Sequence, residues 1–215
     1  MSDAHPLTVR QRFWKRALDL VVAVPFLVCT WWVIVIAVLL ATIDTGRFGL
    51  FRQVRVGRNG RLFHVYKVRT MASVAGGAST TVTSRGDVRI TRLGAFWRRW
   101  KIDEFPQIWN VIKGDMSLVG PRPDVPGYAD TLVDEDCLIL AVRPGITGPA
   151  TLRFRNEEVM LATVADPETF NREVLFPKKV EINLQYLREY SLRSDLHYLM
   201  RTLSLHGSEE DDSFS

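Results

Sequence analysis

An uncharged apolar run from Leu20 to Ile43 constrains this 215-residue chain more than any other part of its sequence. As a helix rising about 1.5 Å per residue, the run would measure roughly 36 Å, which is enough to cross a hydrocarbon core of about 30 Å. It is too long for the apolar part of a secretory signal peptide, and no small-residue cleavage site follows it. The sequence therefore predicts a helix that remains in the protein and enters a membrane.

Basic residues flank this run on both sides. They are Arg10, Arg12, Lys15 and Arg16 before it, and Arg47, Arg52, Arg55, Arg58 and Arg61 after it. Positive charges stay on the cytoplasmic side of a membrane, so a single span would place one cluster outside, whereas a re-entrant helix keeps both inside. Pro25 would supply the bend, because it removes one helical hydrogen bond and clashes with the preceding turn. We predict a re-entrant helix, with a single span as the alternative.

Two further elements are expected after the membrane helix. Asn59-Gly60 lies between partly alternating apolar stretches, which indicates a β-hairpin that would end near Lys67 and Arg69. Residues 72–87 are small, polar and glycine-bearing, so we predict a mobile loop there.

The stretch from Ile90 to Lys101 predicts a basic aromatic helix, because large apolar side chains recur at helical spacing among arginines. Such a helix suits a membrane interface. The alternatives are a packed core face with cations reaching past it, or a nucleic-acid-binding face. No base-reading or stacking module accompanies the stretch, so we expect no nucleic-acid partner.

An adjacent Asp103-Glu104 pair, followed by Arg122 between two prolines, indicates phosphate chemistry. Asp103 suits a nucleophile or metal ligand, Glu104 a second ligand, and Arg122 a forked donor to a phosphate. Pro106 fits the first turn of a helix, so both carboxylates would lie at or just before its N-terminus, where the helix dipole keeps them ionised. The alternative is that the two acids only mark a helix start.

Charge and cysteine content narrow the class of protein. The net charge of +4 favours an anionic partner such as a lipid head group or a nucleotide. The two cysteines form no pattern of a disulfide framework or zinc site. We expect residues 1–48 to form an N-terminal arm and the membrane helix, 49–205 a catalytic domain with partly helical periodicity after Phe176, and 206–215 an acidic disordered tail.

Several motifs together resemble one known family. In chain order they are KRALD, FRQVRVG, VYKVRTM, DVRITRLG, GDMSLVGPRP and VRPGITG, and with the Asp-Glu block they cover most of residues 15–156. They resemble the monotopic phosphoglycosyl transferases, the bacterial sugar transferases that initiate glycoconjugate assembly. The resemblance implies an α+β, mostly helical, monotopic membrane protein with an N-terminal re-entrant helix, interfacial amphipathic helices and a small β-hairpin.

The same resemblance implies a reaction. A sugar 1-phosphate would pass from a UDP-sugar to polyprenyl (undecaprenyl) phosphate at the cytoplasmic face of the bacterial inner membrane, giving a polyprenyl diphosphate sugar and UMP. The transfer would follow ping-pong order through a covalent phosphosugar. Membrane lipids would be further partners, and a homodimer is compatible with such an enzyme although no motif specifies the oligomeric state.

The resemblance also assigns roles to individual residues. It makes Asp103 the nucleophile, with Glu104 beside it, and both would hold Mg²⁺. Five cations lie in matching motifs: Lys67, Arg98 and Arg122 near the bound phosphates, and Arg69 and Arg143 in less defined roles.

The chain departs from the family pattern in three places. Trp31-Trp32 stands near where the family usually has a Ser-Pro kink, Glu157 and Glu158 follow a divergent 149–156 segment, and Asn183 replaces an aspartate. We expect the sugar preference to differ accordingly.

A non-catalytic, membrane-anchored basic scaffold is the alternative from another functional class. It explains the net charge and the apolar run, but it gives the Asp103-Glu104 pair and the Pro-Arg-Pro segment no purpose.

Overall fold

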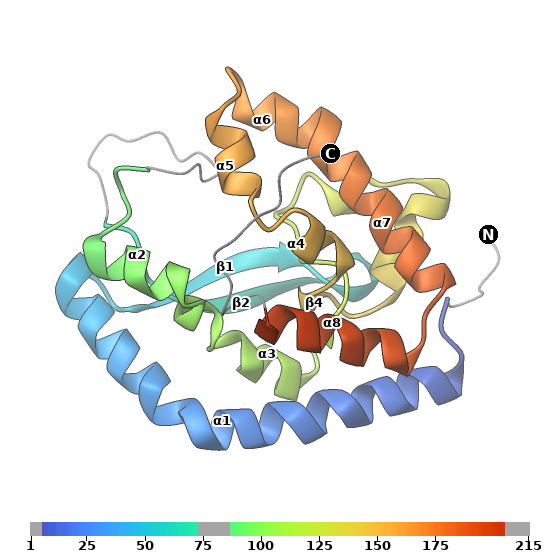
Figure 1. The fold of residues 1–215 in the computed structure, drawn as a ribbon, viewed down its shortest axis with the longest axis horizontal. Helices are drawn as coiled ribbons and strands as arrows, with labels where there is room; N and C mark the ends of the chain where they lie inside the picture. Colours follow the sequence, from blue (N-terminus) through green and yellow to red (C-terminus); the bar gives the residue numbers. More distant parts are fainter. Residues whose placement is uncertain (1–5, 73–86, 205–215) are drawn as a thin grey trace.

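The protein is a mostly helical α+β molecule with a small β-hairpin, as expected (Figure 1). The computed structural model describes residues 6–72 and 87–204. Its α-helices are α1 (Val9–Thr45), α2 (Arg92–Arg99), α3 (Gln107–Lys113), α4 (Pro149–Arg153), α5 (Glu157–Ala162), α6 (Pro167–Phe170), α7 (Phe176–Arg188) and α8 (Leu192–Ser204). Its strands are β1 (Leu50–Val56), β2 (Leu62–Val68), β3 (Ser117–Val119) and β4 (Gly145–Thr147). The loop predicted over 72–87 lies almost wholly outside the described residues, and the tail predicted over 206–215 lies wholly outside them.

Helix α1 contains the whole apolar run and is long and apolar enough to cross a membrane. It begins with a capping box, in which Gln11 N donates to Thr8 Oγ1 at 3.2 Å and Thr8 N donates to Gln11 Oε1 at 2.8 Å. It ends at Gly46, whose φ of 66° suits glycine. Pro25 lies inside the helix, and the ribbon bends near its middle (Figure 1).

Both ends of α1 pack on the same domain. Near its start, Arg16 donates to two backbone carbonyls in the last turns of α3, at 2.7 and 2.8 Å. Near its end, Ala37 and Ala41 are buried against side chains of β2 and α2. Large apolar side chains are exposed along the outer face of the helix, namely Val21, Val24, Val28, Trp31, Trp32, Val35, Leu39 and Ile43. The bent helix thus presents an apolar face that the described part of the protein leaves uncovered.

The predicted β-hairpin is confirmed. Strands β1 and β2 pair antiparallel, with Leu50 opposite Val68. The connection contains Asn59 with φ 59° and Gly60 with φ 73°, left-handed conformations that asparagine and glycine adopt more readily than other residues. The Asn-Gly signal in the sequence therefore marks the turn correctly.

The basic aromatic helix predicted from Ile90 to Lys101 is also confirmed, as α2. Trp97 is buried, whereas Phe96 and Trp100 are about half exposed. One face of α2 therefore packs on the domain and another presents aromatic rings to the surroundings.

Helix α3 joins the hairpin to a second, shorter pair of strands. Asn110 Nδ2 donates to His64 O at 2.8 Å, and Asn110 Oδ1 accepts a hydrogen bond from Tyr66 N at 3.2 Å, so α3 is fastened to β2. Strand β3 follows α3 and pairs parallel with β4, with Ser117 opposite Gly145. The hairpin, α3 and this strand pair form the frame that carries the candidate site.

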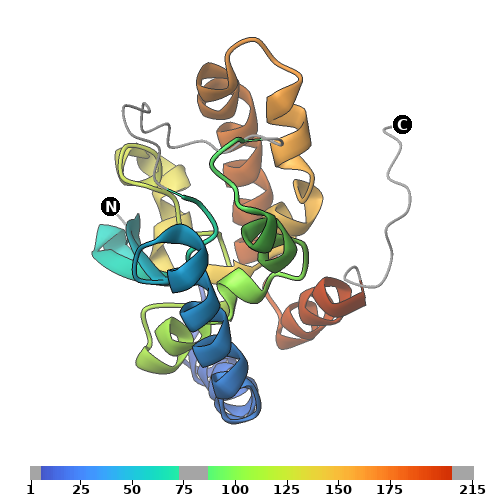
Figure 2. The ribbon, with the colours of Figure 1, turned by 90° about the vertical axis from the view of Figure 1, so that its left-hand side faces the viewer.

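The C-terminal part forms two helices, where the sequence shows helical periodicity. Val180, Leu184 and Leu187 of α7 are buried in the main core together with residues of α1, α3, β2 and β3. Figure 2 shows the hairpin and α8 on opposite sides of the molecule. Tyr198 and Leu199 of α8 pack against the same core.

Candidate functional site

Asp103 and Glu104 lie in a short 3₁₀ turn (Ile102–Glu104) directly before α3. The backbone stays helical between this turn and α3, with Pro106 at the capping position. Lys101, just before the turn, has a φ of 54°, which is uncommon for a residue with a side chain. The predicted placement of both carboxylates just before a helix is confirmed.

Glu104 is held between two cations from distant parts of the chain. Its Oε1 accepts hydrogen bonds from Lys67 Nζ, at 3.0 Å, and from Arg122 Nη2. Lys67 comes from β2, whereas Arg122 follows β3. Burial would raise the pKa of Glu104, but Arg122 and then Lys67 outweigh burial and hold that pKa well below its usual value. Glu104 therefore stays ionised.

Asp103 differs from its neighbour, because no described residue donates a hydrogen bond to its Oδ1. The residue is 7% exposed, and its Oδ1 is buried without a hydrogen bond from any described residue. Burial, followed by the negative charge of Glu104, raises the pKa of Asp103 from 3.8 to about 6, although Lys67 and Lys101 oppose the shift. Both carboxylates were expected to stay ionised, and at neutral pH Asp103 is still mostly so. The pair thus combines one acid fixed by cations with one unpaired acid.

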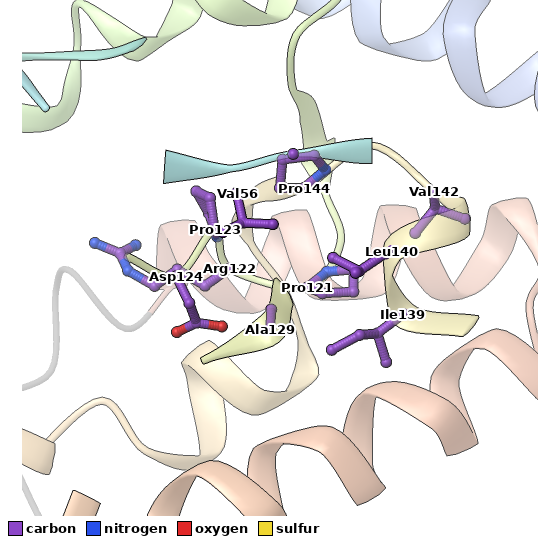
Figure 3. Close-up of a pocket in the computed structure, with 11 residues that line it drawn as sticks. Val56, Pro121, Arg122, Pro123, Asp124, Ala129, Ile139, Leu140, Val142 and Pro144 are labelled. Carbon is purple, nitrogen blue, oxygen red and sulfur yellow. The ribbon is translucent and has the colours of Figure 1, made fainter. Parts of the chain in front are cut away.

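The segment from Pro121 to Pro123 is fastened to the end of β1. The last backbone N–H of β1 donates to Asp124 O at 2.9 Å, and Arg55 Nη1 donates to Pro123 O at 3.1 Å. Figure 3 shows Arg122 and Asp124 on one side of a small pocket, with the apolar side chains of Ile139, Leu140 and Val142 on the other. The prolines therefore line an apolar pocket while Arg122 extends to Glu104.

Helix α5 contributes two acids, Glu157 and Glu158, that pair with cations near the carboxylates. Glu158 forms an ion pair with Arg98 of α2, and Glu157 Oε2 accepts from Lys179 Nζ of α7 at 2.5 Å. The charge of Arg98 lowers the pKa of Asp103, so Arg98 is within electrostatic reach of that carboxylate. The structure thus brings Arg98 to the site, but with its guanidinium engaged by Glu158.

Arg69 and Arg143 lie in other surroundings. Arg69 Nε donates to Phe48 O at 3.0 Å, and the guanidinium lies 5.2 Å from the centre of the Phe51 ring. Arg143 Nε donates to Gly114 O at 2.8 Å, just past the C-terminal end of α3, whereas the carboxylate pair precedes the N-terminal end. Neither contact brings these two cations to Asp103.

Three further residues of this region are not identified by the sequence patterns. Arg55 stands out there only as a charge that flanks the apolar run, yet it lies within electrostatic reach of Glu104. Asp124, whose pKa burial raises to about 6, had no signal beyond its place after the Pro-Arg-Pro segment. Gln107 is 2% exposed and its Nε2 has no hydrogen-bond partner among the described residues. Its place about one turn after Asp103 is the signal in the sequence that could identify it.

Asp103 and Glu104 are the residues that the sequence assigns to a metal ion. Across residues 6–72 and 87–204, no group of three or more His, Cys, Asp or Glu side chains lies together. A divalent cation would therefore take its remaining ligands from water or a bound anion, as Mg²⁺ commonly does.

The amino-acid sequence of this chain is similar to those of known sugar transferases. The model of the family described as "Bacterial sugar transferase" matches residues 10–207. An uncharacterized sugar transferase of Bacillus subtilis, EpsL, is 33% identical over 189 residues, which cover 88% of this chain and 85% of that protein. A UDP-glucose:undecaprenyl-phosphate glucose-1-phosphate transferase of Caulobacter vibrioides is 34% identical over 192 residues, covering 88% and 68%. A putative undecaprenyl-phosphate N-acetylgalactosaminyl 1-phosphate transferase of Bacillus subtilis is 38% identical over 128 residues, covering 60% and 72%.

Proposed function

The chain belongs to the bacterial sugar transferase family, and we propose that it transfers a sugar 1-phosphate from a UDP-sugar to undecaprenyl phosphate. The products are an undecaprenyl diphosphate sugar and UMP. The protein is an enzyme of the phosphoglycosyl transferase class. The names of its relatives include both a glucose and an N-acetylgalactosaminyl 1-phosphate transferase, so the experiment below uses a panel of donors.

The unpaired carboxylate of Asp103, buried beside a cation-held Glu104, is the observation that carries the first half of the reaction. An oxygen of Asp103 attacks the sugar-bearing phosphorus of the donor and forms a new P–O bond. The phosphoanhydride bond to the other phosphate breaks, and UMP leaves with the electron pair. Lys67 and Arg122 offset the negative charge of the donor as it approaches a carboxylate.

The second half of the reaction restores the enzyme. A phosphate oxygen of undecaprenyl phosphate attacks the same phosphorus, and the bond between that phosphorus and Asp103 breaks. The sugar phosphate is now joined to the lipid phosphate, and the carboxylate returns to its starting state. Because UMP leaves before the lipid reacts, the order is ping-pong.

Asp103 and Glu104 would hold a magnesium ion during this reaction. The buried Asp103 Oδ1, which lacks a partner among the described residues, suits a cation that prefers oxygen ligands. Mg²⁺, when bound, would neutralise charge on the donor phosphates. Lys67 and Arg122 keep the Glu104 carboxylate in place beside it.

We further propose that α1 is a re-entrant helix at the cytoplasmic face of the bacterial inner membrane. A straight helix of its length would run about 55 Å. Instead the helix bends, and both of its ends contact one domain, with an exposed apolar face between them (Figure 1). Both basic flanks then stay on one side of the membrane. The exposed rings of Phe96 and Trp100 on α2 suit the interface beside it.

UMP release tests the reaction. Detergent-purified protein is mixed with Mg²⁺, undecaprenyl phosphate and each of a panel of UDP-sugars. We expect release with one donor, and a loss of roughly three orders of magnitude or more in Asp103→Asn. With acceptor omitted, wild type should release about one UMP per active site, because the nucleotide leaves at the first step.

Asp136→Asn is the matched control, since Asp136 is exposed in the 134–141 turn and its change should leave release intact. UMP release that needs the acceptor would contradict ping-pong order. Silence of folded wild type with every donor would instead favour the scaffold.

The topology has its own test. Single cysteines at Arg10 and Phe48, in a chain with Cys29 and Cys137 replaced by serine, are labelled with an impermeant thiol reagent. Both sites should be protected in intact cells and labelled in inside-out vesicles. Labelling of the two sites from opposite sides would establish a single span instead.

A further inference from the structure

Gln107 is a buried polar side chain one helical turn beyond Asp103. It is 2% exposed, and its Nε2 has no hydrogen-bond partner within residues 6–72 and 87–204. Such unpaired donors are uncommon in folded proteins, because burial removes water without replacing its hydrogen bond. The amide therefore weakens the fold, and its presence requires a reason other than stability.

Gln107 lies about one turn beyond Asp103, where the 3₁₀ turn passes into α3. Backbone hydrogen bonds in this stretch join residues three apart, from Phe105 N to Ile102 O and from Ile108 N to Phe105 O. Asp103, Gln107 and Asn110 are all buried. Asn110 bonds the backbone of β2. Gln107 stands between that bonded amide and the carboxylate of Asp103 without a comparable bond.

Two unpaired atoms of opposite character thus occur about one turn apart along the chain. Gln107 Nε2 is a donor without an acceptor, and Asp103 Oδ1 is an acceptor without a donor, among the residues that the structure describes. The two side chains leave the chain about one turn apart, and a phosphoryl group on Asp103 would extend from the carboxylate into the space beside it. Such a group would bring oxygen acceptors to the amide.

We propose that Gln107 donates a hydrogen bond from Nε2 to a phosphoryl oxygen of the phosphosugar carried by Asp103. The inference rests on the proposed function, because it requires that group on Asp103. Gln107 transfers no proton, and no covalent bond to it forms or breaks. Its N–H is already in place before the donor sugar reacts, and it stabilises the negative charge on the phosphoryl oxygens. The energy barrier to phosphoryl transfer therefore falls without any rearrangement of the side chain. As a neutral amide it does not titrate, so its contribution is independent of pH.

Gln107→Met tests the proposal, because methionine has a similar length and no N–H donor. Without acceptor, the rate of the first UMP release should fall about 10- to 100-fold, below the range measured for fixed donors of this kind. Less phosphosugar should accumulate on the protein, as measured by intact-protein mass. The melting temperature should stay equal or rise, because an unpaired buried donor has been removed.

Asn110→Leu is the matched control, since it removes an amide that is bonded to β2 and should lower the melting temperature. A Gln107→Met protein that releases UMP at the wild-type rate overturns the proposal. A melting temperature that falls together with activity also overturns it, because Gln107 would then be structural. If the methionine variant does not fold, Gln107→Leu, which removes the amide donor without adding a charge, is measured by the same readouts.

Failure of this inference differs from failure of the proposed function. If wild type releases no UMP with any donor, the proposed function fails. If wild type releases UMP and Gln107→Met does so equally fast, only the role of Gln107 is rejected.

Discussion

Lys15 Nζ of α1 lies 2.6 Å from Asp195 Oδ2 of α8, so an ion pair joins the two ends of the described chain across 180 positions. Lys15 also donates to Val119 O at 2.8 Å, while Tyr186 and Tyr190 donate to the Asp195 carboxylate. Both charged side chains are almost fully buried. The position of the membrane helix on the domain is therefore set by a buried polar network as well as by apolar contacts.

Lys15→Met should destabilise the protein strongly, because it leaves Asp195 buried without its countercharge. We expect a loss of about 3–5 kcal/mol in the free energy of unfolding, which corresponds to a fall of roughly 10 °C or more in melting temperature. Lys178→Met, at an exposed lysine of α7, should change stability by less than about 0.5 kcal/mol. The double variant Lys15→Met/Asp195→Asn should recover part of the loss. Equal melting temperatures for Lys15→Met and Lys178→Met would contradict a stabilising role of the ion pair between Lys15 and Asp195.

Asp103 should make the protein less stable as pH rises. Its pKa is about 6 in the folded protein against an ordinary 3.8, so the folded state binds more protons than the unfolded state between about pH 4 and pH 6. Stability from this group is therefore lost as pH rises through that window, by on the order of 2 to 3 kcal/mol.

Asp103→Asn removes this penalty because asparagine does not ionise. Without Mg²⁺ or donor, the variant should melt roughly 5–10 °C above wild type at pH 8, and the gap should close near pH 4. Asp136→Asn should follow wild type at every pH. A gap that stays constant from pH 4 to pH 8 would show that ionisation of Asp103 is not its cause.

The sequence predicts those features of the fold and site that depend on neighbouring residues. Hydrophobic runs and turn chemistry locate α1, α2 and the hairpin, and an Asp-Glu pair before a proline locates the start of α3. The resemblance assigns Lys67 and Arg122 to one site, and the structure brings both to Glu104. These residues could be assigned to the site from the sequence because each of them lies in a motif of its own.

The remaining features depend on the path of the chain in space. No local pattern shows that Lys15 meets Asp195, or that Arg55 bonds the carbonyl of Pro123. The motif that contains Arg69 leaves its role undefined, and in the structure Arg69 lies just past the end of β2 with its guanidinium over the ring of Phe51. Partners of long polar side chains are set by tertiary packing, which residue spacing alone does not specify.

Glu158→Gln should strengthen donor binding, since Glu158 pairs with Arg98 beside the carboxylates. Freed of that pair, Arg98 is available to an anionic donor, and the KM for the UDP-sugar should fall about two- to fivefold at low salt. Both side chains are partly exposed, so the effect should shrink as salt screens the pair. Glu135→Gln is the matched control, because Glu135 pairs with Arg188 at 2.7 Å on the surface of α7. A KM that is unchanged or raised in Glu158→Gln would argue against competition between Glu158 and the donor.

Gly49→Ala should disrupt the junction between α1 and the hairpin. Gly49 N donates to Thr42 Oγ1 at 2.8 Å, and a Cβ at Gly49 would lie 2.0 Å from the backbone oxygen of Val38. The helix end and the strand start would have to separate, so we expect a loss of about 2–3 kcal/mol in stability. Gly46→Ala is the control that separates a clash from backbone strain: its Cβ meets open space, and only its φ of 66° is unfavourable, which costs about 1 kcal/mol. Melting temperatures of the two variants give the ranking directly. If Gly46→Ala is the more damaging change, close packing of α1 on the hairpin is not what holds the end of the membrane helix in place.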